Sequence, residues 1–345
     1  MKATSFNTGW TCRHLGSSAP GTPVTLPHDA MLAEERSQTS AGGTNTGWFA
    51  GYDYLYEKHF TPDAAQAAQC AVLEFEGVYH NAEVHLNGEK IASCPYGYSD
   101  FYADLTGKLL PGRDNVLEVI AHNADQPNSR WYSGAGIYRP VTLWTAPARH
   151  ILPDGVQVRT LSIDPAEVEV TVQTTASGAV AVAILDGEQT VATAQAESNG
   201  KAVLQVQIPN AKLWSPDSPA LYRCRAMFGD DCAETTFGVR TLSWGDDGFL
   251  LNGKRVILLG ACVHHDHGVL GACCYPEAEE RKVRLLQKVG YNAVRCAHNP
   301  CSKAFLDACD RLGMLVMDEY ADMWYIHKTQ YDYAGYLPDH WRQDL

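Results

Sequence analysis

Residues 292–319 read NAVRCAHNPCSKAFLDACDRLGMLVMDE, and this stretch decides how the C-terminal part of the chain folds. The short apolar run at 293–297 stops at a polar turn, which is typical of a buried strand. Pro300 is expected to open a helix, because the apolar residues after it recur at helical spacing up to a glycine. A second apolar run, 314–317, ends in an Asp-Glu pair. Strand, helix and strand with polar residues at the strand ends predict a βαβ unit whose strand tips line a site.

The segment before this unit repeats the pattern. An apolar run at 256–259 is expected to form a strand, and residues 277–289 a helix. Three successive strands would then end in polar groups, which are His264, His265 and Asp266, then Arg295, His298 and Asn299, then Asp318 and Glu319. An open doubly wound sheet would give a similar pattern, but no glycine-rich phosphate loop follows any strand. A (β/α)8 TIM barrel fits better, because its functional groups gather at one face.

The rest of the chain is predicted to be β structure. Residues 1–146 hold short strands with turn residues between them, and Asn87-Gly88 is a type I′ hairpin signal, so a jelly roll or sandwich is expected. Residues 147–246 hold six or seven short strands, which predicts an immunoglobulin-like β-sandwich. Residues 247–345 supply only three barrel strands, whereas a complete barrel takes about 250 residues. We therefore expect a truncated barrel, the front part of a longer enzyme.

Charge and composition exclude several classes of partner. The net charge is 27 − 40 = −13, which argues against nucleic acid and anionic membrane surfaces. The sequence contains no apolar run of membrane-spanning length. Its first residues show no apolar signal region, and its 11 cysteines are irregularly spaced, as expected of reduced core residues rather than a disulfide framework. The cytoplasm is the expected location.

Two motifs resemble one enzyme family. The Arg-x-x-His-x-Pro turn at 295–300 and Cys-Asp-Arg-x-Gly-x-x-x-x-Asp-Glu at 309–319, with His-His-Asp upstream at 264–266, resemble glycoside hydrolase family 2, the β-galactosidases and β-glucuronidases. The resemblance extends to the jelly roll through the loop 26–29 and the segment 130–139. It implies a retaining exo-β-glycosidase that removes terminal β-galactosyl or β-glucuronosyl units. The implied partner is a small carbohydrate or glycoside conjugate, and a homo-oligomer is expected.

The resemblance also implies where catalysis resides. A retaining mechanism uses one Glu as acid/base and another as nucleophile, about 5–5.5 Å apart. Both are expected beyond Leu345, so no catalytic residue is assigned in this chain. Asp318 and Glu319 do not replace them, because adjacent residues on a strand point to opposite faces. From another functional class, the alternative is a non-catalytic carbohydrate-binding or interaction fragment.

Several residues are expected to contact or support the sugar. The predicted substrate-binding residues are His264, His298, Asp318, Glu319, Arg130, Trp131, Trp324 and Tyr325, and the predicted supporting residues are Arg295, Asn299, His265 and Asp266. A neutral histidine can exchange hydrogen bonds with sugar hydroxyls, although His264 could instead be a satisfied core residue. Arg130 could read a uronic acid carboxylate or only tie its loop to the barrel. The aromatic residues could stack on sugar or only pack domains together.

A zinc site is an alternative interpretation of the segment 262–298. Cysteines and histidines gather in this region, at Cys262, His264, His265, His267, Cys273, Cys274, Cys296 and His298, but the paired CxxC spacing of a structural zinc site is missing. Relatives with a catalytic-site Mg²⁺ carry Glu and His a few residues past the Asp-Glu pair, where this chain has Met323 and Tyr325. The prediction is therefore no metal and no cofactor.

Overall fold

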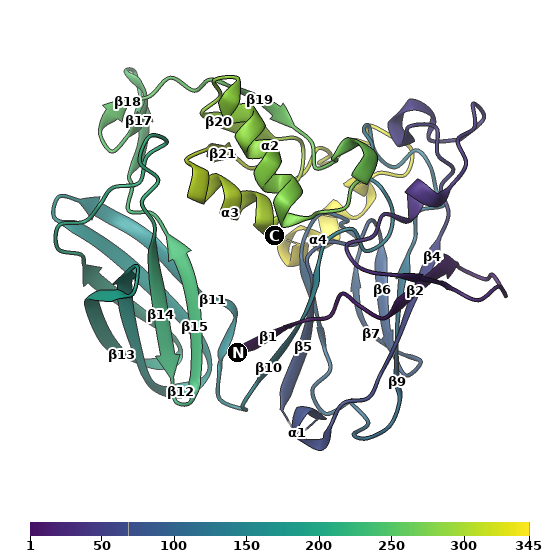
Figure 1. The fold of residues 1–345 in the computed structure, drawn as a ribbon, viewed down its shortest axis with the longest axis horizontal. Coiled ribbons are helices and arrows are strands. Elements are labelled where there is room, and N and C mark those ends of the chain that lie inside the picture. Colours follow the sequence, from purple (N-terminus) through teal and green to yellow (C-terminus); the bar gives the residue numbers. More distant parts are fainter. Residues whose placement is uncertain (68, 345) are drawn as a thin grey trace.

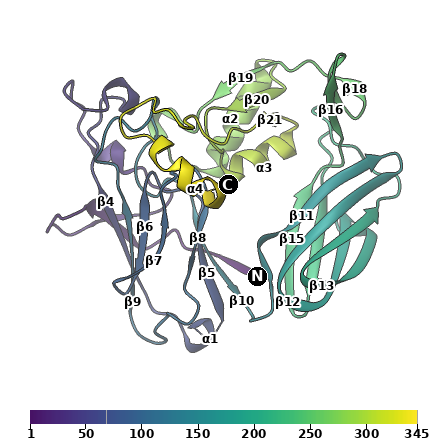
Figure 2. The ribbon, with the colours of Figure 1, turned by 180° about the vertical axis from the view of Figure 1, so that it is seen from behind.

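The computed structural model describes residues 1–67 and 69–344, and it contains two β domains joined by a βαβ layer (Figures 1 and 2). In both views the β domains lie on opposite sides and the three parallel strands with their helices lie between them. The predicted fold class is confirmed. None of the described helices combines the length and apolarity that crossing a bilayer demands.

The first β domain is a sandwich of two antiparallel sheets. One sheet has the order β1 (Lys2–Ser5), β10 (Val141–Ala146), β5 (Cys70–Phe75), β8 (Phe101–Asp104). The other has the order β3 (Thr22–Val24), β2 (Trp10–His14), β4 (Tyr54–Phe60), β9 (Asn115–Ala121), β6 (Ala82–Leu86), β7 (Glu89–Cys94). Alternate residues of both sheets point inward and form one apolar core, as the period of two requires. Asn87 and Gly88 both have positive φ between β6 and β7, as a type I′ turn demands.

The second β domain is built on one long hairpin. Its strands are β11 (Ile151–Ile163), β12 (Ala166–Asp186), β13 (Gln189–Gln207), β14 (Tyr222–Phe228) and β15 (Asp231–Phe237). The prediction of six or seven short strands was wrong in detail, because β12 and β13 each run through a register shift instead of ending. The first half of β12 pairs with β11 and the second half with β14, so one strand serves both layers of the sandwich.

The barrel portion begins with a small antiparallel sheet, β16 (Leu242–Gly245), β17 (Gly248–Leu251) and β18 (Lys254–Arg255). Three parallel strands follow, β19 (Gly260–Val263), β20 (Ala293–Cys296) and β21 (Leu315–Met317), with the helices α2 (Pro276–Lys288) and α3 (Lys303–Leu312) between them. We propose domain boundaries at 146/147 and 246/247, the second of which falls in the turn between β16 and β17.

Two predicted elements begin later than expected. The apolar run 256–259 is not a strand, because the Asn292 side chain accepts from the Leu259 N–H (2.8 Å) and donates to the Ile257 carbonyl (2.9 Å) in place of a strand partner. The helix expected from Pro300 begins at Lys303. The Ser302 hydroxyl caps this helix by accepting a hydrogen bond from the backbone N–H of Phe305. The loop after β21 leads into one further helix, α4 (Leu337–Asp344).

Short helical turns complete the chain. They are α1 (Ala64–Ala67) and the 3-10 turns η1 (Ala30–Ala33), η2 (Gly43–Thr46), η3 (Gly268–Leu270) and η4 (Tyr333–Gly335).

One side chain joins all three parts of the molecule. The Lys303 ammonium, at the start of α3, bonds to Glu74 and lies 3.3 Å from the Asp100 carboxylate, both in the first β domain. It also lies 2.8 Å from the carboxylate of Asp154 in β11 of the second. These carboxylates raise the pKa of Lys303 above its ordinary value against the opposing effect of burial. The junction therefore fixes the βαβ layer against both β domains.

Candidate functional site

The strand ends of the βαβ layer face loops of the first β domain. The parallel register places Val263 opposite Cys296 and Arg295 opposite Met317, so the C-terminal ends of β19, β20 and β21 lie level. The carboxyl ends of parallel strands form the functional face of a barrel. A functional site is therefore expected among the side chains just beyond these strand ends.

Glu319, Arg295 and His298 form one bonded cluster. The Arg295 guanidinium donates to Glu319 Oε1, and His298 Nδ1 lies 2.8 Å from Glu319 Oε2. Burial opposes ionisation of Glu319, but the bonds from Arg295 and His298 outweigh it and hold the pKa of the carboxyl below its ordinary value. The bond to the carboxylate favours the tautomer with the proton on Nδ1. His298 Nε2 then offers a lone pair that could accept a hydrogen bond from a sugar hydroxyl.

Trp131 packs between two of the predicted histidines. Its ring stacks on His264 with centroids 5.2 Å apart and meets the His298 ring edge-on at 5.4 Å. The Nδ1 atom of His264 is buried and makes no hydrogen bond with the described residues. Burial lowers the pKa of His264, so the ring is neutral near pH 7 and holds an unused polar atom. A fully satisfied core histidine would not leave that atom unpaired.

Arg130 forms an ion pair with Asp322, a contact that the sequence did not predict. Its Nε donates to Asp322 Oδ2 at 2.7 Å and its Nη2 to Oδ1 at 2.5 Å, and Lys328 Nζ lies 2.8 Å from the same carboxylate. Asp322 has only 4% of its side chain exposed. Burial opposes its ionisation, yet the bonds from Arg130 and Lys328 lower the pKa of Asp322 below its ordinary value. The geometry therefore favours a tie between the jelly-roll loop and the loop after β21.

Two supporting residues hold the strand ends in place. His265 Nε2 lies 3.2 Å from the Ser133 carbonyl, between the rings of Tyr98 and Tyr138. Burial lowers the pKa of His265 to about 3, so this histidine stays neutral and joins the end of β19 to the jelly roll. Asn299 is buried and donates to the Pro300 carbonyl at 3.1 Å, while its Oδ1 lacks a partner among the described residues.

Four predicted residues lie apart from this cluster. Trp324 and Tyr325 are 55% and 76% exposed and do not line the cavity beside Trp131. Asp318 accepts from the Cys301 N–H at 3.2 Å, away from Glu319, as opposite faces of a strand require. Asp266 is half-buried and makes no hydrogen bond or ion pair within the described part of the chain.

Residues of the jelly roll and of the loop after β21 line a cavity beside Trp131 and His298, and sequence reasoning did not identify them. A small cavity of about 20 Å³ lies among strand-end, jelly-roll and loop residues, and the lining residues that were not predicted include Tyr79, His80, Tyr98, Asn128, Met323, Tyr331 and Tyr333. The only available signal was the density of tyrosines in two turn-rich segments, 96–98 and 331–336. Spacing alone does not show which tyrosines face a barrel.

Comparison with known families agrees with this arrangement. Three family models match consecutive parts of the chain: "Glycosyl hydrolase 2 galactose-binding domain-like" at residues 10–149, "Glycosyl hydrolases family 2" at 154–240, and "Glycosyl hydrolases family 2, TIM barrel domain" at 243–331. The chain belongs to glycoside hydrolase family 2. The segment that matches the family 2 barrel model contains all three parallel strands and the cluster of Arg295, His298 and Glu319.

Individual relatives of this family 2 chain are longer than the chain itself. It is 38% identical to a β-galactosidase of Bacteroides ovatus, over 99% of this chain and 44% of the relative. It is 32% identical to a putative β-glucuronidase of Formosa agariphila, over 93% of this chain and 32% of the relative. A crystal structure of a family 2 member from Bacteroides cellulosilyticus superposes with a TM-score of 0.92 at 34% identity, covering 100% of this chain and 49% of that one. The chain thus spans less than half the length of these relatives.

Proposed function

We propose that the complete protein is a retaining exo-β-glycosidase that removes a terminal β-galactosyl or β-glucuronosyl unit. The observation that carries the proposal is the bonded cluster of Glu319, His298 and Arg295 beside Trp131, at the strand ends of a family 2 barrel. His298 Nε2 is the group that we assign to a sugar hydroxyl. Arg295 would hold Glu319 ionised while a sugar is bound.

The acid and the nucleophile are proposed to come from residues outside this chain. A general acid on a glycosidase needs a carboxyl whose pKa is raised. The site carboxyls Glu319 and Asp322 have the opposite property, since their bonds to cations lower the pKa of each. The chain would therefore supply binding and positioning groups to a pocket completed by other residues.

The sugar and the cellular setting are further parts of the proposal. The bidentate bond to Asp322 occupies the Arg130 fork, so a uronic acid reader is not assigned to Arg130. The presence of 11 free thiols supports a reducing compartment, the cytoplasm. We also propose a homo-oligomer, which light scattering on the purified protein would test.

The experiment is hydrolysis of p-nitrophenyl β-galactoside and β-glucuronide by the full-length protein, followed by NMR of the first sugar released. Release of the β-anomer is expected, because two successive displacements retain configuration. Initial release of the α-anomer would reject the retaining mechanism. A second candidate, a non-catalytic carbohydrate-binding protein, is favoured by the low pKa of both site carboxyls. It predicts sugar binding without release of nitrophenol.

A further inference from the structure

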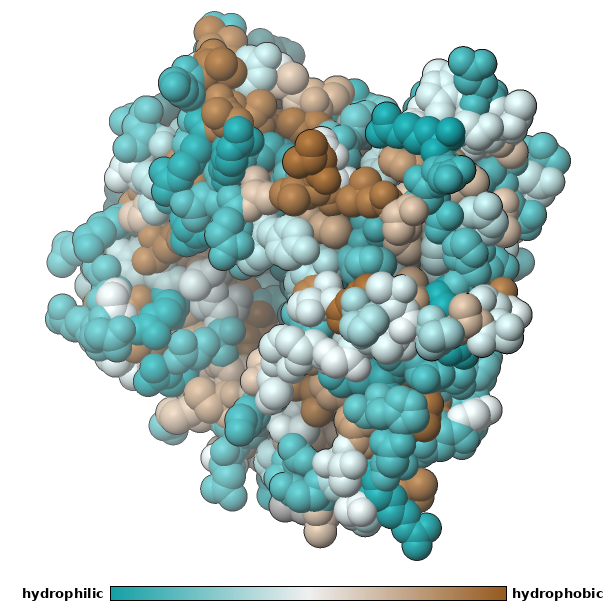
Figure 3. All heavy atoms as spheres, turned by 45° about the vertical axis from the view of Figure 1, so that its right-hand side comes forward, coloured by the Kyte–Doolittle hydropathy of each residue, from teal (hydrophilic) through white to brown (hydrophobic). Residues whose placement is uncertain are grey.

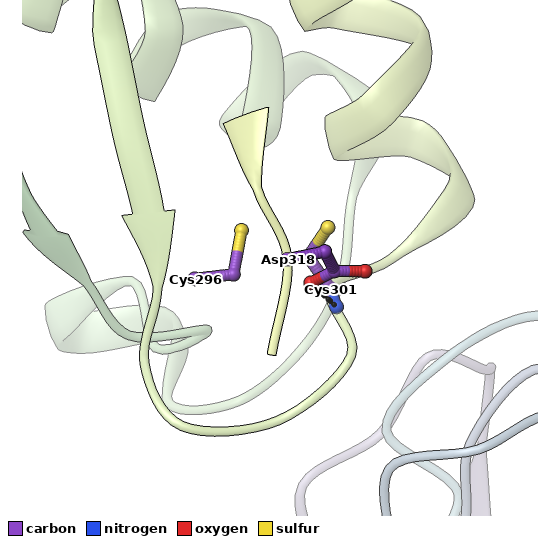
Figure 4. A group of neighbouring side chains, drawn as sticks. All are labelled: Cys296, Cys301 and Asp318. Atoms are coloured by element: carbon purple, nitrogen blue, oxygen red, sulfur yellow. Dashed lines mark hydrogen bonds between the residues drawn. The ribbon is translucent and has the colours of Figure 1, made fainter. Parts of the chain in front are cut away.

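Two thiols and a carboxylate meet on the helix side of the parallel strands. Cys296 is the last residue of β20, Cys301 lies in the loop before α3, and Asp318 follows β21. Their sulfur and carboxylate oxygen atoms all lie within 4.8 Å of one another. In Figure 4 both sulfur atoms point to the same side, and Asp318 lies next to Cys301. None of the three belongs to the proposed sugar-contacting set around His298.

The sulfur and oxygen atoms of the set are ligands that suit a thiophilic divalent cation. Cysteine sulfur and aspartate oxygen are both zinc ligands, and a tetrahedral ion with Zn–S bonds of about 2.3 Å separates its sulfurs by about 3.8 Å. Ligand atoms already within 4.8 Å of one another would need to move by roughly 1 Å at most to reach that geometry. Cys296 is buried, Cys301 is half-buried and Asp318 is exposed. Solvent can therefore reach the carboxylate side, where an ion would enter and a water could fill the fourth position.

The charge around the set is suited to a divalent ion. Two thiolates and one carboxylate carry three negative charges, of which a divalent cation offsets two. The guanidinium of Arg139 is buried and donates to the carbonyl of Pro300, the residue before Cys301, at 2.8 Å. Its other hydrogen bonds also go to backbone carbonyls, those of Glu76 and Tyr98, and no carboxylate of the described residues bonds to it directly. The positive charge of Arg139 offsets the third negative charge of the ligand set.

A second group of potential ligands, made of three carboxylates, already holds a cation of the protein itself. Glu74, Asp100 and Asp154 also lie within 4.8 Å of one another. Their centre is already taken by the Lys303 ammonium, which bonds to Glu74 and lies 3.3 and 2.8 Å from the other two carboxylates. A cation would have to displace this ammonium from the junction between domains. The thiol set has no such occupant among the described residues.

We propose that Cys296, Cys301 and Asp318 form a binding site for a zinc-class divalent cation, which braces the turn between β20 and α3. The two cysteines bracket residues 297–300, so an ion held by both sulfurs closes the turn that carries His298 and Asn299. The site is structural, and it does not depend on the proposed glycosidase activity.

The test is a titration of the purified, reduced chain with Co²⁺, followed by displacement with Zn²⁺. One equivalent of Co²⁺ should give sulfur-to-cobalt charge transfer and the intense visible bands of tetrahedral cobalt, and Zn²⁺ should abolish both. Cys301→Ser should lower the affinity at least about a hundredfold, since a coordinating sulfur is lost. Asp318→Asn should weaken binding but keep the thiolate bands, and because Asp318 is exposed this variant should fold. The matched control is Cys232→Ser, which removes an exposed thiol of the second β domain.

Each outcome decides the proposal. Equal Co²⁺ binding by wild type and Cys301→Ser, or loss of the bands in Cys232→Ser alone, overturns it. So does a wild-type chain that remains spectroscopically silent while mass spectrometry confirms that its thiols are reduced. A chain that loses two hydrogens in air and then gives no bands until it is reduced again would still support the site, because a Cys296–Cys301 disulfide removes both sulfur ligands.

Discussion

His298 is placed so that one ring nitrogen is committed and the other is available. Its Nδ1 lies 2.8 Å from Glu319 Oε2, which orients the ring beside Trp131. If the full-length protein has the proposed activity, His298→Ala is expected to lower its kcat/KM by a factor on the order of 10²–10³, mainly as lost transition-state binding. The control is His85→Ala, which removes a histidine paired with Glu83 on the jelly roll. An unchanged kcat/KM with a lower Tm would make His298 structural.

Arg130 is expected to act through Asp322 rather than on the substrate. Arg130→Ala removes a bidentate partner from a carboxylate that is 4% exposed, and Lys328 alone would remain to compensate it. We expect equal losses of kcat/KM on β-galactoside and β-glucuronide, with a lowered Tm. Arg130→Lys should recover part of the Tm. A loss confined to the glucuronide would instead assign Arg130 to the substrate carboxylate.

Some residue contacts were predictable and others were not. Arg295, His298 and Glu319 follow neighbouring parallel strands, so their meeting follows from strand order alone. Arg130 and Asp322 are 192 residues apart on different domains, and nothing in a single sequence pairs them. The exposure of Trp324 and Tyr325 was equally unpredictable, because aromatic composition does not show whether a residue lines a sugar site or lies in a surface loop.

Helix α3 ends at a glycine that touches another domain. Gly313 has φ +81°, and a Cβ there would run into the carbonyl of Pro216 in the second β domain. Gly290, beyond α2, has φ +93° and open space around its Cα. Gly290→Ala should lower the free energy of unfolding by about 1 kcal/mol through backbone strain alone. Gly313→Ala should lower it by about 2–4 kcal/mol, because the clash with Pro216 adds to the strain. Urea unfolding followed by circular dichroism measures both, and equal losses would contradict the contact with Pro216.

Helix α2 carries a buried carboxylate that makes stability depend on pH. Burial opposes the charge of Glu279, but His267 Nε2 at 3.2 Å and Lys282 Nζ at 3.4 Å outweigh it and lower the pKa to about 2, from an ordinary 4.5. The folded-state pKa is the lower one, so this stabilisation is present above about pH 4.5 and is lost as pH falls toward 2.

Glu279→Gln should therefore lower the free energy of unfolding by on the order of 2–3 kcal/mol at pH 7, with a difference that shrinks below pH 4. Urea midpoints at pH 7, 4 and 3 measure this. The matched control is Glu280→Gln, the neighbouring, partly exposed carboxylate paired with Arg284 and Arg311, which should change the free energy of unfolding little. A constant difference at every pH would contradict the assignment.

At the scale of elements, boundaries were harder to predict than element types. The apolar run 256–259 matched a strand pattern, but a single asparagine side chain took the place of a strand partner. The long strands β12 and β13 were divided in the prediction because the polar residues at their register shift look like turns. Both errors arise where a tertiary contact overrides a local pattern.

At the scale of the molecule, the β domains bury their cores while the parallel strands leave apolar surface exposed. The two sandwiches hold extended apolar clusters. The exposed apolar side chains near the parallel strands include Trp244, Ile257, Leu259 and Met317. In Figure 3 the largest brown areas lie in the upper half, where Figure 1 places the barrel portion. Three strands were predicted to be unable to close a barrel, and this surface is the physical consequence.

The final prediction is that residues 1–345 alone show no glycosidase activity. Glu319 is bonded to Arg295 and His298, and Asp318 faces the Cys301 loop, so neither is free to protonate a leaving group or attack a sugar. Without an acid and a nucleophile, both steps of the retaining mechanism are lost, which typically costs many orders of magnitude. The measurement is release of nitrophenol by the purified chain, with the full-length protein assayed in parallel. Turnover that survives separate substitution of Asp318 and Glu319 would indicate contamination. Turnover abolished by either substitution would place catalysis within this chain and reject the proposed division of labour.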